Sequence, residues 1–235
     1  MPLPIIESPK YETKLPSTGN KLIFRPYLVK EEKILMMAIE SSDQNQIMQA
    51  MKDTVSSCTF GKINPDELPI FDLEYVFLKL RSKSVGEVAK IGIKCESCGE
   101  STSNEINLDE IVVKTDNLPS NKIMLTDKIG INLRWPTVDF VSEMSTKTKE
   151  DQTSSAYDVI AHCIESIFDD VSVYPTSEQT REEIITFIES LNQAQFQKIQ
   201  QFIEAMPKLE HEVSFTCKHC KKDNKVMLRG LQSFF

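Results

Sequence analysis

The spacing of apolar residues along the chain alternates between the period of a strand and the period of a helix. Before Pro26, two short alternations, Tyr11-Thr13-Leu15 and Leu22-Phe24, flank the polar stretch PSTGN. This pattern predicts an extended N-terminal arm followed by a β-hairpin. Three amphipathic helices are predicted next. Their apolar positions are Ile34, Met37 and Ala38; Ile47, Met51 and Val55; and Leu73, Val76, Phe77 and Leu80.

The period falls to two after Val88, and the alternation is interrupted before it resumes at Ile106. The stretch IMLTDKIGINLRW predicts a hairpin with its turn near Asp127. Helical patterns then return in TVDFVSEM, in AYDVIAHCIESIF as one helix through Phe168, and in TREEIITFIESL and NQAQFQKIQQFIEAM. Alternation comes back in the last 28 residues. The pattern therefore predicts an α+β protein with a helical body and several β-hairpins.

Two CxxC pairs lie 122 residues apart within matching surroundings. In IGIKCESCGES and in VSFTCKHCKKD, each pair follows an apolar alternation, and a second alternation comes after it. Each segment is predicted to be a strand, a tight turn that holds two thiols, and a returning strand. The equivalent positions are Ile91 and Val213, Ile93 and Phe215, Cys95 and Cys217, Cys98 and Cys220, and Ile106 and Leu228.

Zinc prefers four soft ligands in a tetrahedron, and a CxxC turn aims two sulfur atoms at one ion while its amides hydrogen-bond the thiolates. We therefore expect a split four-cysteine zinc-ribbon-like module formed by two β-CxxC-β knuckles. One structural zinc ion per chain would be held by Cys95, Cys98, Cys217 and Cys220. The 118 residues between the two pairs are permitted because loop-closure entropy grows only logarithmically with length.

Other interpretations of the cysteines stay open beside this one. A redox CxxC normally begins a helix, whereas polar, strand-like sequence follows both pairs here. An iron-sulfur cluster also uses four thiolates, and the spacing does not exclude it. His219 could replace one thiol, although a solvated side chain is favoured. The remaining cysteines, Cys58 and Cys163, lie on predicted helices and are expected in the core.

The changes of pattern divide the chain into four segments. Residues 1–86 hold the arm, the hairpin and three helices, and residues 87–135 hold the first knuckle and a second hairpin. Residues 136–206 are expected to be helical, and residues 207–235 hold the second knuckle and a C-terminal tail. The shared metal ion requires this last segment to pack with residues 87–108.

Composition and charge exclude several classes of protein. Because 40% of the residues are apolar and 26% are charged, an ordinary globular fold is expected. The net charge of -8 disfavours nucleic acid as a partner. No apolar run is long enough for a membrane helix, and MPLPIIESPKYE lacks the features of a signal peptide, so we expect a cytoplasmic protein. Thiols stay reduced in that compartment, which favours metal binding or burial for the six cysteines.

No constellation of acid, base and nucleophile marks the chain as an enzyme. His162 and His211 have no evident nucleophile or paired carboxylate beside them in the sequence, and both are interpreted as core or surface histidines. Neither a GxGxxG nor a GxxxxGK[ST] motif is present. We therefore expect no catalytic residues and no cofactor other than the metal ion.

Four short motifs carry a resemblance to a known family. A Leu-Pro-x-x-Gly turn at Leu15–Gly19 leads into an Arg-Pro-Tyr strand end at Phe24–Tyr27 and a Lys-Glu-Glu-Lys helix start at Lys30–Lys33. A Leu-Arg-x-x-Ser-x-Gly segment follows at Leu80–Gly86. Over about residues 11–95 the chain resembles the N-terminal region of the baseplate hub protein family of T-even-type tailed phages.

The resemblance implies a non-enzymatic viral protein that is either a subunit of the baseplate hub or a factor that assists its assembly. Its implied partners are phage baseplate hub proteins, met in the host bacterial cytoplasm during assembly or in the tail baseplate of the virion. The arm up to Tyr11 and the tail Leu231–Phe235 are the segments expected to order on a partner. Phe234 and Phe235 are either an anchor for that partner or part of the protein's own core.

An alternative function belongs to a different class. Four-cysteine ribbons are common in nucleic-acid-binding and transcription-associated factors, and lysines gather at the second knuckle. These lysines are Lys218, Lys221, Lys222 and Lys225. The acidity of the whole chain and the lack of aromatic residues among these lysines rank this alternative below the baseplate role.

Overall fold

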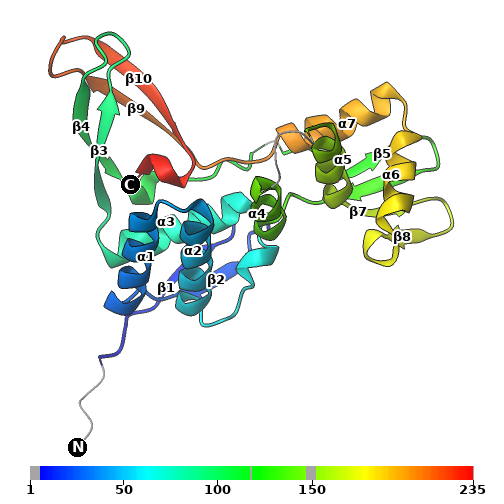
Figure 1. Cartoon of the computed structure of the whole chain (residues 1–235), viewed down its shortest axis with the longest axis horizontal. Coiled ribbons are helices and arrows are strands. Elements are labelled where there is room, and N and C mark those ends of the chain that lie inside the picture. Colours follow the sequence, from blue (N-terminus) through cyan, green and yellow to red (C-terminus); the bar gives the residue numbers. More distant parts are fainter. Residues whose placement is uncertain (1–5, 117, 147–151, 235) are drawn as a thin grey trace, which may run out of the picture. The chain divides into compact units, whose positions relative to one another are not determined.

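The computed structural model describes residues 6–116, 118–146 and 152–234 of the chain (Figure 1). Contacts divide the protein into two compact units. The first comprises Met1–Thr115 together with Lys208–Phe235, and the second comprises Asp116–Pro207. The second unit is therefore an insertion between two parts of the first in the sequence. Both units mix helices with antiparallel sheet, and the predicted α+β class is confirmed.

The first unit begins with the predicted hairpin and the three predicted helices. Strands β1 (Tyr11–Lys14) and β2 (Lys21–Phe24) pair antiparallel. Helices α1 (Val29–Ser41), α2 (Gln44–Cys58) and α3 (Ile70–Ser84) follow. Helix α3 lies deepest in this unit. Its four expected core positions are all buried, namely Leu73, Val76, Phe77 and Leu80.

Helix α1 buries a different face from the one that its apolar spacing predicted. Leu35 and Ala38 are buried, whereas Ile34 and Met37 are 52% and 60% exposed. The reason is the buried carboxylate of Glu31, which lies one turn before Leu35 and pairs with Arg25. Because Glu31 must face this partner, the helix is rotated so that Ile34 and Met37 point away from the core.

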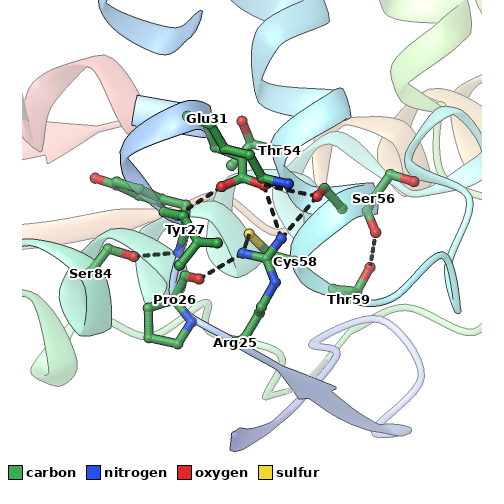
Figure 2. A network of polar contacts seen from close by, with 12 residues as sticks. Arg25, Pro26, Tyr27, Glu31, Thr54, Ser56, Cys58, Thr59 and Ser84 are labelled. Atoms are coloured by element: carbon green, nitrogen blue, oxygen red, sulfur yellow. Dashed lines mark hydrogen bonds and ion pairs between the residues drawn. The ribbon is translucent and has the colours of Figure 1, made fainter. Parts of the chain in front are cut away.

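The Arg25–Glu31 ion pair lies at the centre of a polar network that joins four elements (Figure 2). Arg25 Nη2 donates to Glu31 Oε1 over 2.9 Å, and its Nη1 lies 3.6 Å from Cys58 Sγ at the end of α2. The backbone N–H of Leu28 donates to Glu31 Oε2, which caps the start of α1. Tyr27 N–H donates to Ser84 Oγ at the end of α3. The network thus fixes β2 and three helices around one buried charge pair.

Two further hairpins in the first unit carry the cysteines. Strands β3 (Val88–Lys94) and β4 (Ser101–Asn107) form one, and strands β9 (Glu210–Thr216) and β10 (Asp223–Arg229) form the other. Each is a regular antiparallel pair of seven-residue strands. Figure 1 shows the two hairpins side by side with their turns at the same end.

Helix α3 anchors the bases of both hairpins. Lys79 Nζ donates to the backbone carbonyl of Asp109 just after β4, and Ser82 and Lys83 both bond the Asp109 carboxylate over 2.7 Å. After β10, a 3₁₀ turn at Leu231–Phe234 returns to α3. There the N–H of Leu231 donates to Glu74 Oε1 over 3.1 Å.

The C-terminal tail packs against its own protein. Phe234 is completely buried and Leu231 is nearly so. Of the two roles considered for these residues, a place in the core is the one that the structure supports for Phe234, while Phe235 lies outside the described residues. The expectation that the tail orders on a partner is therefore wrong for Leu231–Phe234. On the N-terminal arm, by contrast, Ile6 is 92% exposed.

The second unit contains a four-stranded antiparallel sheet in the order β5-β6-β7-β8. The strands are β5 (Lys122–Met124), β6 (Gly130–Leu133), β7 (Ile164–Phe168) and β8 (Val173–Pro175). The helices are α4 (Val138–Thr146), α5 (Gln152–Cys163), α6 (Arg181–Glu189) and α7 (Gln193–Glu204). A single apolar core, in which Trp135 stacks on Phe202, joins the sheet to α5, α6 and α7.

The helix predicted through Phe168 ends five residues earlier, at Cys163. Residues Ile164–Phe168 form strand β7, and β8 follows. The segment 136–206, which was predicted to be helical, is therefore not wholly helical. The β7 segment suits both structures, because Ile164 and Phe168 continue the helical spacing while Ile164 and Ser166 alternate onto one buried face. Pairing on both sides, with β6 and β8, decides in favour of the strand.

Replacing Glu31 with Gln tests the buried ion pair. Burial alone would raise the pKa of Glu31, but the bonds from Arg25, Leu28 and Ser57 lower it to about 2. The stabilisation is therefore present above the ordinary carboxyl pKa of 4.5 and is lost as the pH falls toward 2. E31Q should lower the free energy of unfolding by about 3 kcal/mol at neutral pH, because it leaves a buried cation unpaired.

Urea unfolding of wild type and E31Q at a series of pH values measures this effect. The difference between the two proteins should shrink as the pH falls. The control is E40Q, which changes an exposed carboxylate on the same helix. A difference between wild type and E31Q that stays constant from neutral pH to pH 2 would contradict the assignment.

Candidate metal centre

The two CxxC turns bring four sulfur atoms to one point. Their Sγ atoms all lie within 4.8 Å of one another, and two short contacts cross between the hairpins. Cys95 Sγ lies 3.6 Å from Cys220 Sγ, and Cys98 Sγ lies 3.7 Å from Cys217 Sγ. A tetrahedral ion with bonds of about 2.3 Å to each sulfur requires sulfur atoms about 3.8 Å apart. The four thiols are thus at distances at which they can hold a metal ion.

Each pair of cysteines sits in the same tight turn. Cys95 N–H donates to the Glu100 carbonyl and Gly99 N–H donates to the Cys95 carbonyl, both over 2.9 Å. The second turn repeats these bonds between Cys217 and Lys222 and between Lys221 and Cys217. The turns need a left-handed residue, which is Gly99 with φ 75° in the first and Lys221 with φ 61° in the second. Lys221 pays a small steric cost there that glycine avoids.

Backbone amides in the turns favour thiolates at the first cysteine of each pair. The N–H groups of Cys220 and His219 lower the pKa of Cys217 to about 6. Burial raises the pKa of Cys95, but the N–H groups of Cys98 and Ser97 outweigh it, and the net shift is downward. Such amide bonds are the usual outer partners of metal-bound thiolates.

The second cysteine of the first pair behaves differently. The Glu100 amide lowers the pKa of Cys98, but partial desolvation and the neighbouring thiols raise it to about 12. Four thiolates cannot crowd together without a compensating cation. A bound metal ion supplies that charge and removes the proton from each ligand.

The structure also shows two residues of the site that the sequence analysis missed. Thr102 and Asn224 are polar residues with only 2% and 8% of their surface exposed. Each lies seven residues after the first cysteine of its own hairpin and bonds the opposite turn. The signal that could have revealed them was the 122-residue offset, since they occupy equivalent positions in the two segments.

The remaining cysteines are outside the site. Cys58 and Cys163 are fully buried, and burial raises the pKa of their thiols to about 11 and about 12. Both are core residues, as predicted. In the part of the chain that the structure describes, the only cluster of His, Cys, Asp or Glu side chains at metal-binding distances consists of Cys95, Cys98, Cys217 and Cys220.

The histidines take no part in this cluster. His219 is exposed on the second turn. His162 stacks on Phe140 with 4.0 Å between the ring centres and lies 3.1 Å from Thr137 Oγ1. Burial, together with the nearby charge of Arg134, lowers the pKa of His162 to about 4. His162 is therefore a neutral, half-buried packing residue at neutral pH.

A family model described as "T4 bacteriophage base plate protein" matches residues 8–235, which is nearly the whole chain. The chain belongs to this family. The match includes the N-terminal motifs, both cysteine hairpins and the second unit. No curated protein and no solved structure matches the chain.

Membership of the T4 base plate family makes this a structural phage protein whose natural neighbours are other proteins of the tail base plate. None of the helices in the described ranges combines the length and apolar character that crossing a membrane requires.

Substituting the cysteines one at a time tests the metal centre. C95S or C217S should abolish stoichiometric metal binding, because a three-sulfur site lacks the closed tetrahedral shell. The expected loss of stability is about 4 kcal/mol when free metal is about 1,000-fold above its dissociation constant. Elemental analysis and thermal unfolding with and without a chelator measure both effects.

The matched controls are C58A and C163A, which remove buried thiols of the same protein. These variants should keep the metal and lose stability only through packing. Equal metal content in C95S, C217S and the two controls would show that the four clustered sulfur atoms do not bind the ion.

Proposed function

We propose that the protein is a non-enzymatic component or assembly factor of the phage baseplate hub that acts by binding other baseplate proteins. The observation that carries this proposal is the family match over residues 8–235, together with the hub-like motifs at Leu15–Gly19 and Leu80–Gly86. Assembly would begin in the host bacterial cytoplasm, and the tail baseplate of the virion would be the final location.

The proposed cofactor is one structural zinc ion per chain, bound by Cys95, Cys98, Cys217 and Cys220. Four sulfur ligands fill the shell and leave no position for a substrate or an activated water, so the ion serves structure. Because the four sulfur atoms lie within 4.8 Å of one another, they suit one zinc ion better than a multi-iron cluster, which needs its cysteines further apart. The ion would join two CxxC pairs that are separated by 118 residues of chain.

The proposed contact surface for a baseplate subunit is the outer side of helix α1. Five large apolar residues of this one helix are at least half exposed, namely Val29, Ile34, Met36, Met37 and Ile39. Such a concentration of exposed apolar side chains marks protein-binding surfaces. Methionine suits the role, because its flexible side chain adapts to an irregular partner.

The zinc-ribbon nucleic-acid factor remains the second candidate. Its support is that Lys218, Lys221 and Lys222 are exposed at the tip of the second hairpin. However, Glu96 and Glu100 are exposed at the adjoining tip of the first hairpin, so the local field is mixed. Salt-sensitive binding of DNA or RNA fragments would favour this candidate.

Co-expression with the hub proteins of the same phage tests the proposal. The wild-type protein should co-purify with at least one of them. The double variant M36E/M37E should weaken that interaction at least about tenfold, because two charges would be buried at the contact. The control N45E/Q49E adds the same two charges to exposed positions of α2 and should bind normally.

Affinity measured by titration with the purified partner distinguishes the two parts of the proposal. Failure of the wild type to bind any hub protein would overturn the hub role. Binding that M36E/M37E leaves unchanged would instead overturn the assignment of α1 as the contact surface.

A further inference from the structure

The tips of the two cysteine hairpins are joined by polar side chains as well as by sulfur. Thr102 and Asn224 lie on the returning strands β4 and β10, and both are buried. Each accepts a hydrogen bond from the backbone N–H of the residue that follows the first cysteine of the opposite turn. The contacts are therefore reciprocal and cross from one hairpin to the other.

Asn224 bridges the backbones of both turns. Its Oδ1 accepts from Glu96 N–H over 3.1 Å, and its Nδ2 donates to the Lys222 carbonyl over 2.9 Å. That carbonyl also accepts from Cys217 N–H over 2.9 Å. One amide side chain thus links the turn that carries Cys95 to the turn that carries Cys217.

Thr102 reaches a sulfur atom. Its hydroxyl accepts from Lys218 N–H over 3.4 Å and donates to Cys217 Sγ over 3.8 Å. An O–H···S bond withdraws electron density from the sulfur of a bound thiolate. Thr102 therefore contacts both the backbone and a ligand atom of the opposite turn.

Packing alone does not account for these two polar residues. The neighbouring inward positions of the same hairpins are apolar, as at Ile93, Ile106 and Leu228, and a branched apolar residue would fill such sites at lower cost. These two residues instead form hydrogen bonds between the tips of the two hairpins. No short stretch of chain connects the two turns, so other contacts must hold them at ligand distance.

We propose that Thr102 and Asn224 are positioning residues of the four-cysteine centre. They align the two turns so that the sulfur atoms lie at metal-binding distances, and Thr102 also tunes the Cys217 sulfur. This inference rests on the proposed metal-binding role. Outer partners of this kind typically change metal affinity by about 10- to 100-fold.

Titration of the metal-free full-length protein with Co²⁺, followed by competition with Zn²⁺, tests the proposal. T102V and N224A should each bind about 10- to 100-fold more weakly than wild type. T102V should also shift the sulfur-to-cobalt charge-transfer band, because it removes the hydrogen bond to Cys217. N224A should leave the band in place, since its bonds go to backbone atoms. T102S, which keeps the hydroxyl, should restore both affinity and band.

Two matched controls come from the same hairpins. T216V removes a threonine hydroxyl that bonds Asp223 within its own hairpin, and N104A removes an amide that bonds the Thr102 carbonyl on its own strand. Both should bind Co²⁺ as the wild type does. If T102V and N224A weaken binding no more than these controls, the positioning role is overturned while the metal site stands. If the wild-type protein binds neither Co²⁺ nor Zn²⁺, the metal site itself is overturned.

Discussion

The meeting of two CxxC turns is the constraint on which the first unit depends. Two hairpins separated by more than a hundred residues must place sulfur atoms within 3.6 to 3.7 Å of each other. A contact just beyond the hairpins helps to bring them together, because Val113 and Leu209 pair there as an isolated antiparallel bridge. The segments that lead into and out of the insertion are therefore adjacent. An inserted unit with neighbouring ends costs little closure entropy beyond that of the bridge.

A second constraint is the buried Arg25–Glu31 ion pair, which decides which residues of α1 are exposed. A carboxylate that must face its guanidinium rotates α1 about its axis, and the rotation leaves Ile34 and Met37 facing outward. The exposed apolar surface of α1 is therefore a consequence of a polar contact inside the protein. An ion pair of this kind is rarely the most stabilising choice for a core. Its value here lies in fixing which side of α1 faces the solvent.

Local sequence patterns were enough to predict most of the helices and hairpins and the clustering of the four cysteines. A CxxC turn is defined within a few residues, and its repetition at a fixed offset identifies Cys95 and Cys217 as equivalent. The rest depended on contacts between distant segments. Nothing near Ile164 shows that strand β6 will pair with it, and nothing near Glu31 shows that Arg25 will be buried beside it. Thr102 and Asn224 were missed for the same reason, because each acts on the opposite hairpin.

The two cysteine hairpins are held together at their bases by contacts that need no metal ion, and at their tips by contacts that involve the four cysteines. At their bases, both hairpins are anchored to α3, the first through Asp109 and the second through Leu231 and Phe234. None of these contacts involves a sulfur atom. At their tips, the hairpins meet through the four thiols and the side chains of Thr102 and Asn224. Loss of the ion should therefore loosen the tips while the bases stay in place. The ion would therefore stabilise the way in which the two tips meet, while helix α3 holds the bases.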